Sequence, residues 1–301
     1  MQYNHGIILI DKPANISSAQ MVSRVKSILK AKKAGHAGTL DPFATGLMIC
    51  CVNRGTRLAR FFLSGNKTYE AVLHLGVETD TQDFTGKMLA SRAVPVLTEG
   101  KIAAQFETFV GTSQQVPPVY SALKHNGLPL YSYARKGKPV QKPARQIVIS
   151  EIQLRDISLP LIRFEVSCSA GTYVRTLCAD MGKAFGCGGH LKELRRLKSS
   201  GFAVEDAVTL EGLEKAKDEG DLKRYVMPLA ESLKGMALWM ADPFLKEKIL
   251  NGVPLNTQDV PPARPDASGG LIKIIDDQRE LLAVLEYKKE RQQYDYCCVF
   301  N

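Results

Sequence analysis

The sequence has 301 residues, of which 45% are hydrophobic and 24% are charged, as in ordinary folded globular proteins. The formal net charge is +9 and the pI is about 9.1, which favours a polyanionic partner such as nucleic acid, or an anionic membrane surface. No apolar run approaches the roughly 18 residues of a membrane-spanning helix, so we do not expect a helical membrane protein.

The seven cysteines are odd in number, include two pairs of sequence neighbours and contain no C-x-x-C spacing. This arrangement indicates neither a disulfide framework nor a zinc site. The N-terminus also lacks a basic segment followed by a long apolar core, so we expect no signal peptide. The cysteines are therefore expected to be reduced thiols in a cytoplasmic protein, which we take as a monomer.

The first half of the chain alternates strand and helix patterns. Residues 6–10 predict a short strand, and apolar residues at helical spacing from Met21 to Leu29 predict a helix with Ser17 or Ser18 as its N-cap. Residues 47–52 predict a buried strand. Residues 69–75 predict another, with Tyr69 on its buried face, and Thr98 opens a predicted helix.

The second half continues in the same way up to about residue 234. We predict paired strands at 145–157 and 162–167, a turn into a helix at 171–182, a short basic segment at 191–198, a strand at 201–204 and a helix at 210–217. Short strand-like runs then dominate. We therefore predict an α+β catalytic domain over residues 1–234, with a mixed, mainly antiparallel sheet flanked by helices, and a small β-rich domain over residues 235–301.

A basic and aromatic segment covers residues 117–145, which contain no Asp or Glu. Its cationic residues include Lys124 and Arg145, and three tyrosines are interleaved with them. Cationic and aromatic side chains together suit phosphates and stacked bases. A solvated basic loop is the plainer alternative.

Asp41 stands alone among glycines in the stretch 34–46, AGHAGTLDPFATG, directly after a basic segment. An Asp-Pro dipeptide often opens a turn, so spacing alone leaves a structural role open. The chain contains no P-loop, no Gly-x-Ser-x-Gly elbow and no His or Cys cluster with metal spacing. These absences argue against a nucleotide triphosphatase, a serine hydrolase and a metalloenzyme.

The order of six motifs favours a chemical role for Asp41. They are 6–13 (GIILIDKP), 31–46 (AKKAGHAGTLDPFATG), 67–69 (KTY), 116–124 (VPPVYSALK), 171–175 (GTYVR) and 194–197 (LRRL). Over about the first 230 residues the chain resembles the TruB family, the bacterial tRNA pseudouridine(55) synthases. The C-terminal segment loosely resembles the small PUA-like RNA-binding domain of that family.

The resemblance implies roles for individual residues. Asp41 matches the nucleophilic aspartate, Tyr69 the tyrosine that stacks on the target base and moves a proton, and Arg175 the arginine paired with the aspartate. The implied substrate-binding residues are His36, which fills the space left by the flipped uridine, Tyr173 and Leu197 in the pocket wall, and Lys67, Lys124 and Arg145. The segment 117–145 resembles the insertion that closes over RNA.

The implied reaction is the isomerisation of a uridine in the T arm of tRNA, at position 55. It exchanges an N1–C1′ bond for a C5–C1′ bond, so no redox change occurs and no cofactor or metal is expected. The target base must be flipped out of the folded RNA, which costs a few kcal/mol. An arginine beside a buried carboxylate is expected to lower the carboxylate's pKa and keep it ionised.

Three alternatives remain open. The chain could be an RNA-binding or tRNA-folding factor whose catalysis is secondary, and both roles can coexist. It could be a guide-RNA-dependent relative, but long basic tails are missing and the insertion resembles stand-alone enzymes, so we expect no guide RNA. A membrane-surface protein is the weakest option, because no basic amphipathic helix with exposed aromatics is present.

Overall fold

The computed structural model describes residues 5–261 and 270–300. Within these residues the larger sheet has nine strands, in the order β1-β3-β12-β4-β11-β10-β7, with β2 paired to β3 and β13 to β12. Their bounds are β1 Gly6–Lys12, β2 Ala34–His36, β3 Thr45–Val52, β4 Lys67–Leu75, β7 Gly111–Gln115, β10 Arg145–Ser158, β11 Leu161–Cys168, β12 Gly189–Ser199 and β13 Phe202–Ala203. Of these pairings only β3 with β12 is parallel, which confirms the predicted mixed, mainly antiparallel sheet.

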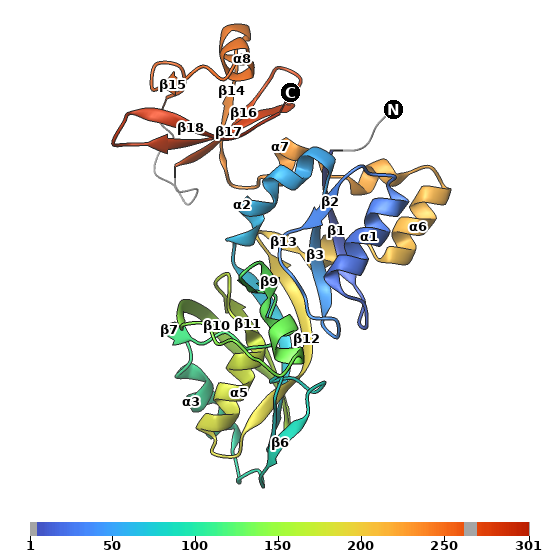
Figure 1. Cartoon of the computed structure of the whole chain (residues 1–301), viewed down its shortest axis with the longest axis vertical. Helices are drawn as coiled ribbons and strands as arrows, with labels where there is room; N and C mark the ends of the chain where they lie inside the picture. Colours follow the sequence, from blue (N-terminus) through green and yellow to red (C-terminus); the bar gives the residue numbers. More distant parts are fainter. Residues whose placement is uncertain (1–4, 262–269, 301) are drawn as a thin grey trace.

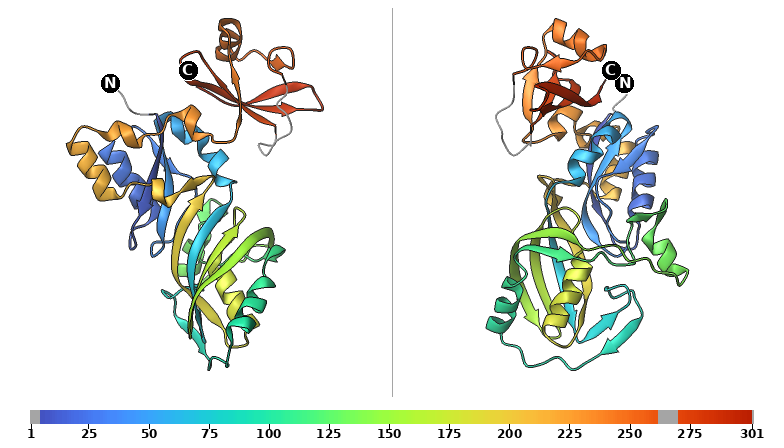
Figure 2. Two further views of the ribbon diagram at one scale, coloured as in Figure 1. Left: turned by 180° about the vertical axis from the view of Figure 1, so that it is seen from behind. Right: turned by 60° about the vertical axis from the view of Figure 1, so that its left-hand side comes forward.

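Helices cover this sheet in two groups (Figures 1 and 2). α3 (Glu99–Glu107) and α5 (Val174–Ala184) pack over the part made by β4, β10, β11 and β12, around a core that includes Phe106, Phe164 and Met181. α1 (Ser18–Ile28) and α6 (Leu210–Asp218) cover β1 and β3. Ser17 caps α1 and Thr98 caps α3, as their sequences predict.

A second sheet of five strands lies at the other end of the described chain, in the order β14-β16-β17-β18-β15. Its elements are β14 Ala237–Met240, α8 Pro243–Leu250, β15 Leu255–Asn256, β16 Leu271–Ile275, β17 Leu281–Lys288 and β18 Gln293–Val299. The predicted C-terminal β domain is thus present. The predicted boundary between residues 234 and 235 stays a prediction, and residues 1–4, 262–269 and 301 of the two predicted ranges lie outside the described residues.

Smaller elements connect these layers. They are η1 Asn53–Leu58, α2 Ala59–Leu63, β5 Val77–Thr79, β6 Met88–Ser91, β8 Lys124–His125, β9 Leu128–Pro129, α4 Leu130–Arg135, η2 Val204–Asp206, η3 Leu222–Tyr225 and α7 Leu229–Ser232. The seven cysteines are all free thiols. In the part of the chain that the structure describes, no helix has the length and apolarity needed to cross a membrane.

The sequence pattern misses one long strand, β12. Residues 191–198 were expected to form only a short basic segment, but they lie between β3 and β4 near the middle of the sheet. Register shifts at Leu191/Glu193 and Arg196/Lys198 interrupt the two-residue alternation along this strand. The pattern of one buried residue in two is therefore broken, and the charged residues obscure what remains of it.

Candidate active site

Asp41 lies in a loop between β2 and β3 whose ends require glycine. Gly38 and Gly46 have φ angles of +109° and +98°, a region that other residues rarely adopt. A Cβ on Gly46 would also lie 2.3 Å from the carbonyl oxygen of Arg196 on the neighbouring strand. Gly46 therefore allows the loop to return into the sheet directly beside β12.

Two buried side chains hold the residues on either side of Asp41. The Ser18 hydroxyl is 2.9 Å from both the backbone N and the O of Leu40, donating to the oxygen and accepting from the nitrogen. Lys12 Nζ donates to the carbonyl of Pro42 at 3.2 Å and to that of Ile16 at 2.8 Å. Burial lowers the pKa of Lys12 to about 8. The carboxylate thus projects from a backbone fixed on both sides.

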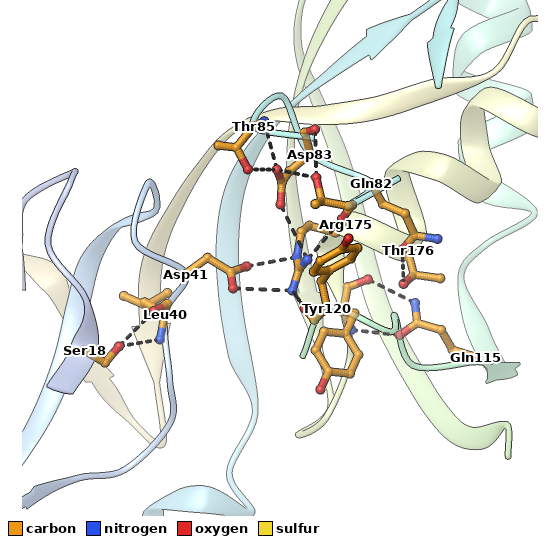
Figure 3. A network of polar contacts seen from close by, with 12 residues as sticks. Ser18, Leu40, Asp41, Gln82, Asp83, Thr85, Gln115, Tyr120, Arg175 and Thr176 are labelled. Carbon is orange, nitrogen blue, oxygen red and sulfur yellow. Dashed lines mark hydrogen bonds and ion pairs between the residues drawn. The ribbon is translucent and has the colours of Figure 1, made fainter. Parts of the chain in front are cut away.

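Asp41 faces Arg175, the second residue of α5 (Figure 3). Arg175 Nε lies 3.0 Å from Asp41 Oδ2, and Nη2 donates to Oδ1 at 3.4 Å. The arginine side chain is only 5% exposed, whereas the aspartate side chain is 34% exposed. The arginine is therefore fixed in the protein, and the carboxylate is open to a bound molecule.

Arg175 has three further partners, which fix its orientation. Nη1 donates to the carbonyl of Thr81 at 3.0 Å and lies 3.5 Å from Asp83 Oδ2. Nη2 donates to the carbonyl of Tyr120 at 2.8 Å. Tyr120 belongs to the insertion at 117–145. Arg175 therefore contacts three separate segments: the Asp41 loop, the turn that contains Asp83, and this insertion.

The pKa of the Asp41 carboxyl is raised, chiefly because the protein around it removes most of its hydration although one side faces the pocket, and this desolvation disfavours its charged form. Arg175 and Lys12 oppose this effect, and the charge of Asp83 adds to it. As expected from the sequence, Arg175 lowers the pKa of Asp41, but the rise caused by burial is larger. Asp41 therefore needs a higher pH to ionise than an ordinary aspartate.

Asp41 and Arg175 line a pocket of about 310 Å³ near the middle of the larger sheet. The other residues around it come from the Asp41 loop, α2, β4, β10, β12, the insertion and the segment between β11 and α5. Those used below are Gly38, Leu63, Lys67, Tyr69, Leu123, Arg145, Tyr173, Leu194 and Arg196. A pocket of this size can hold one nucleobase with part of its sugar.

Two tyrosines and one arginine shape the pocket wall. Tyr69 is 9% exposed, and its pKa is raised by burial. The Tyr173 backbone is held by the buried Gln115 side chain, which donates to its carbonyl at 3.1 Å and accepts from its amide at 2.8 Å. The Arg145 guanidinium lies 4.9 Å from the centre of the Tyr173 ring and donates to the carbonyl of Gly171.

Family models match two adjoining stretches of the chain. Residues 26–174 match the N-terminal domain of TruB family pseudouridylate synthases, and residues 175–234 match the tRNA pseudouridylate synthase B C-terminal domain. A relative from Hydrogenovibrio crunogenus, "tRNA pseudouridine synthase B", is 40% identical over 296 residues, 98% of this chain and 94% of the relative. The chain belongs to the TruB family. A relative of the same name from Burkholderia mallei is 42% identical over 281 residues, 93% of this chain and 92% of the relative.

Solved structures agree with this TruB assignment at the level of fold. The "Crystal Structure of a Cbf5-Nop10-Gar1 Complex" contains a chain that matches with a TM-score of 0.77 at 24% identity, covering all of this chain and 86% of that one. A chain of an archaeal box H/ACA sRNP Nop10-Cbf5 complex gives a TM-score of 0.73 at 24% identity. The predicted pseudouridine synthase fold is therefore confirmed. As a member of the TruB family, the chain is a pseudouridine synthase, which is an isomerase.

In this TruB chain the predicted site residues divide into two groups. Asp41, Tyr69, Arg175, Tyr173, Lys67 and Arg145 meet in the pocket, whereas His36, Leu197 and Lys124 do not line it. Leu197 packs against the core that contains Phe62 and Phe202, and Leu194 forms the apolar wall in its place. Lys67 Nζ donates to the carbonyls of Leu63 and Gly65, so it secures the end of α2.

His36 is the last residue of β2, directly before the loop that carries Asp41, and it is partly buried. Its Nδ1 atom is buried without a hydrogen-bond partner, and burial lowers its pKa. Lys124 is exposed on β8, while the preceding Leu123 lines the pocket. Neither residue contacts the pocket in this conformation, so their predicted roles in RNA binding stay predictions.

Sequence reasoning missed several polar residues of the TruB site. Asp83, Lys12 and Gln115 are each no more than 4% exposed, yet each binds a residue or loop of the pocket. The signal for Asp83 was present in the stretch 79–86, TDTQDFTG, where Thr and Asp alternate before a glycine in a basic chain. Arg196, which belongs to the segment 191–198 that was predicted to be short and basic, is also buried, with 1% of its surface exposed.

Proposed function

We propose that this enzyme converts the uridine at position 55, in the T arm of tRNA, into pseudouridine, with Asp41 as the nucleophile. The observation that carries this proposal is the open carboxylate of Asp41, held by a buried arginine at the wall of a base-sized pocket. The names of the relatives, tRNA pseudouridine synthase B, support tRNA as the substrate. We further propose that it acts as a cytoplasmic monomer without a guide RNA.

The chemistry follows from this arrangement. The Asp41 carboxylate attacks C1′ of the flipped nucleotide, and the N1–C1′ bond breaks with its electron pair remaining on the base. The base turns, C5 forms the bond to C1′, and the carboxylate leaves. C5 then loses its proton and N1 gains one, so that atoms and electrons balance. We assign the removal of the C5 proton to Tyr69, and its position in the wall of the pocket supports this role.

Tritium at C5 of uridine tests the proposal directly, because this hydrogen is lost only when C5 bonds to C1′. We expect the enzyme to release one equivalent of tritium from an unmodified tRNA transcript. A matched transcript with cytidine at position 55 should release none. Release of one equivalent from that control would contradict the proposed position, and no release from either transcript would contradict the proposed activity.

RNA binding should extend from the pocket along η1 and α2. Arg54, Arg57 and Arg60 recur every three residues, and they line a groove with Leu250 and residues 297–299 of the C-terminal part. Arg54 and Arg57 lie three apart in the 3₁₀ helix η1 and therefore on one side of it, and Arg60 in α2 lines the same groove, so the three guanidinium groups form a row. α2 then ends at Leu63, which lines the active-site pocket. A row of cations leading to the pocket suits an RNA backbone.

We expect the Arg54→Glu, Arg60→Glu double variant to weaken tRNA binding and to reduce its salt dependence, by about one unit of log–log slope for each phosphate that the protein no longer binds. Arg57 is kept, because it also donates to the carbonyl of Val299 and lies over the Phe300 ring. Filter binding at several salt concentrations measures both effects. The control, Lys101→Glu with Lys183→Glu on α3 and α5, has the same net charge and should bind like wild type; equal effects in both variants would contradict a specific role for the arginine row.

A further inference from the structure

Arg196 is a buried cation that the mechanism above does not use. It lies on β12 and is 1% exposed. Among the described residues, it is the largest residue whose side chain is fully buried. No carboxylate of these residues lies within ion-pair distance of it, although its neighbour Arg195 pairs with Asp11 at 2.7 Å. Burying an unpaired charge is unfavourable unless its donors are well used. The contacts of Arg196 therefore indicate what it does.

The guanidinium binds both ends of the loop that carries Asp41. Nε donates to the carbonyl of Leu47 at 2.6 Å, and Nη2 donates to the carbonyl of Gly38 at 3.1 Å. The backbone of Arg196 also pairs with Gly46, the second residue of β3 just after the loop, in the parallel β3–β12 ladder. One residue thus fixes the separation of the two loop ends through its side chain and its main chain.

Arg196 also lies against Tyr69. The two residues are direct partners in the β12–β4 ladder, so their side chains lie on the same face of the sheet, and both line the pocket. The charge of the guanidinium opposes the rise that burial causes in the pKa of Tyr69. The Arg196 guanidinium and the Tyr69 phenol therefore lie side by side in the pocket wall.

We propose that Arg196 is a positioning residue for the isomerisation, holding the Asp41 loop at both ends and packing beside Tyr69 in the pocket wall. The inference rests on the proposed function, because both residues matter only if they act on one flipped base. A misplacement of about 1 Å at a reacting group can reduce a rate about 100-fold. Arg196 should therefore influence the chemical step far more than the binding of tRNA.

Arg196→Lys tests the proposal, because lysine keeps the charge but cannot donate in two fixed directions. We expect single-turnover tritium release at saturating tRNA to fall about 100-fold, with the tRNA dissociation constant unchanged within about twofold. Arg196→Ala should lose at least as much, and added guanidinium ions should restore part of its rate. The matched control, Arg195→Lys on the same strand, should keep the wild-type rate and affinity.

Each outcome bears on the proposal. A wild-type rate in Arg196→Lys would overturn it. So would a parallel loss of tRNA binding and of the thermal transition, which would assign Arg196 to general stability. A lower rate with intact binding, restored by guanidinium in Arg196→Ala, supports it. Absence of tritium release from the wild-type protein would overturn the proposed function itself, and the inference with it.

Discussion

Replacing Asp41 with asparagine is expected to reduce tritium release from tRNA by at least about 10,000-fold while leaving tRNA binding intact. Asparagine has nearly the same shape but cannot attack C1′. Arg175 would stay in place, because it keeps Asp83 and the carbonyls of Thr81 and Tyr120 as partners. Release under single-turnover conditions, beside filter binding, measures both properties.

The same variant separates catalysis from a role in tRNA folding. If the protein also promotes folding of tRNA, Asp41→Asn should accelerate the refolding of a denatured transcript as well as wild type does. Asp218→Asn, at an exposed position at the end of α6, is the matched control and should retain full activity. Near-normal tritium release from Asp41→Asn would return Asp41 to a structural role in its loop.

Replacing Arg175 with methionine is the second change with a large expected effect, on both activity and stability. It leaves Asp83, whose side chain is 5% exposed, without its cationic partner, and removal of one member of a buried ion pair costs about 3–5 kcal/mol. Activity should fall at least about 100-fold, because the guanidinium no longer places the carboxylate of Asp41. Thermal unfolding and tritium release measure the two effects.

A double variant distinguishes these two effects. Adding Asp83→Asn to Arg175→Met removes the unpaired buried charge, so most of the stability should return while the activity stays low. Arg195→Met is the matched control, because that arginine pairs with Asp11 at a half-exposed site. Recovery of activity together with stability in the double variant would show that Arg175 only supports the fold.

In Arg175→Met, the pH profile of the remaining tritium-release rate should shift to higher pH. Asp41 must be ionised to attack, so the rate rises with pH through its pKa, which burial raises and Arg175 lowers. Removal of Arg175 takes away the lowering contribution, and the pKa rises further. The acid limb of the profile should therefore shift to higher pH, and the reduction relative to wild type should be largest at low pH. An unchanged acid limb would contradict this electrostatic role.

For wild type, the raised pKa of Asp41 also has a consequence for stability. A carboxyl whose pKa is higher in the folded state binds its proton more tightly there than in the unfolded chain. Ionisation of Asp41 therefore opposes folding above this pKa, and the opposition disappears as the pH falls below it. Asp41→Asn should accordingly melt no lower than wild type near neutral pH, which a thermal scan checks.

The elements that the sequence predicted best are those with a complete local signal. α1 and α3 have both a cap and helical periodicity, and β4 has an uninterrupted alternation that places Tyr69, Ala71, Leu73 and Leu75 in one core. The six motifs were sufficient for the family, and the family models and relatives confirm it. β12 was missed because its register shifts break the alternation on which strand prediction depends.

The sequence by itself determined the residue types of the site, because Asp41, Tyr69 and Arg175 stand in short motifs that can be read without a fold. It could not determine the partners of these residues, since Asp83, Gln115 and Arg196 come from segments far apart in the chain and no local pattern links them. The choice of Leu194 over Leu197 as a pocket residue depends on the fold, because a shift in β12 register changes which side chains face the pocket. The tertiary structure decided the pKa of Asp41 too, because burial depends on everything packed around the carboxylate and outweighs the single arginine visible in the sequence.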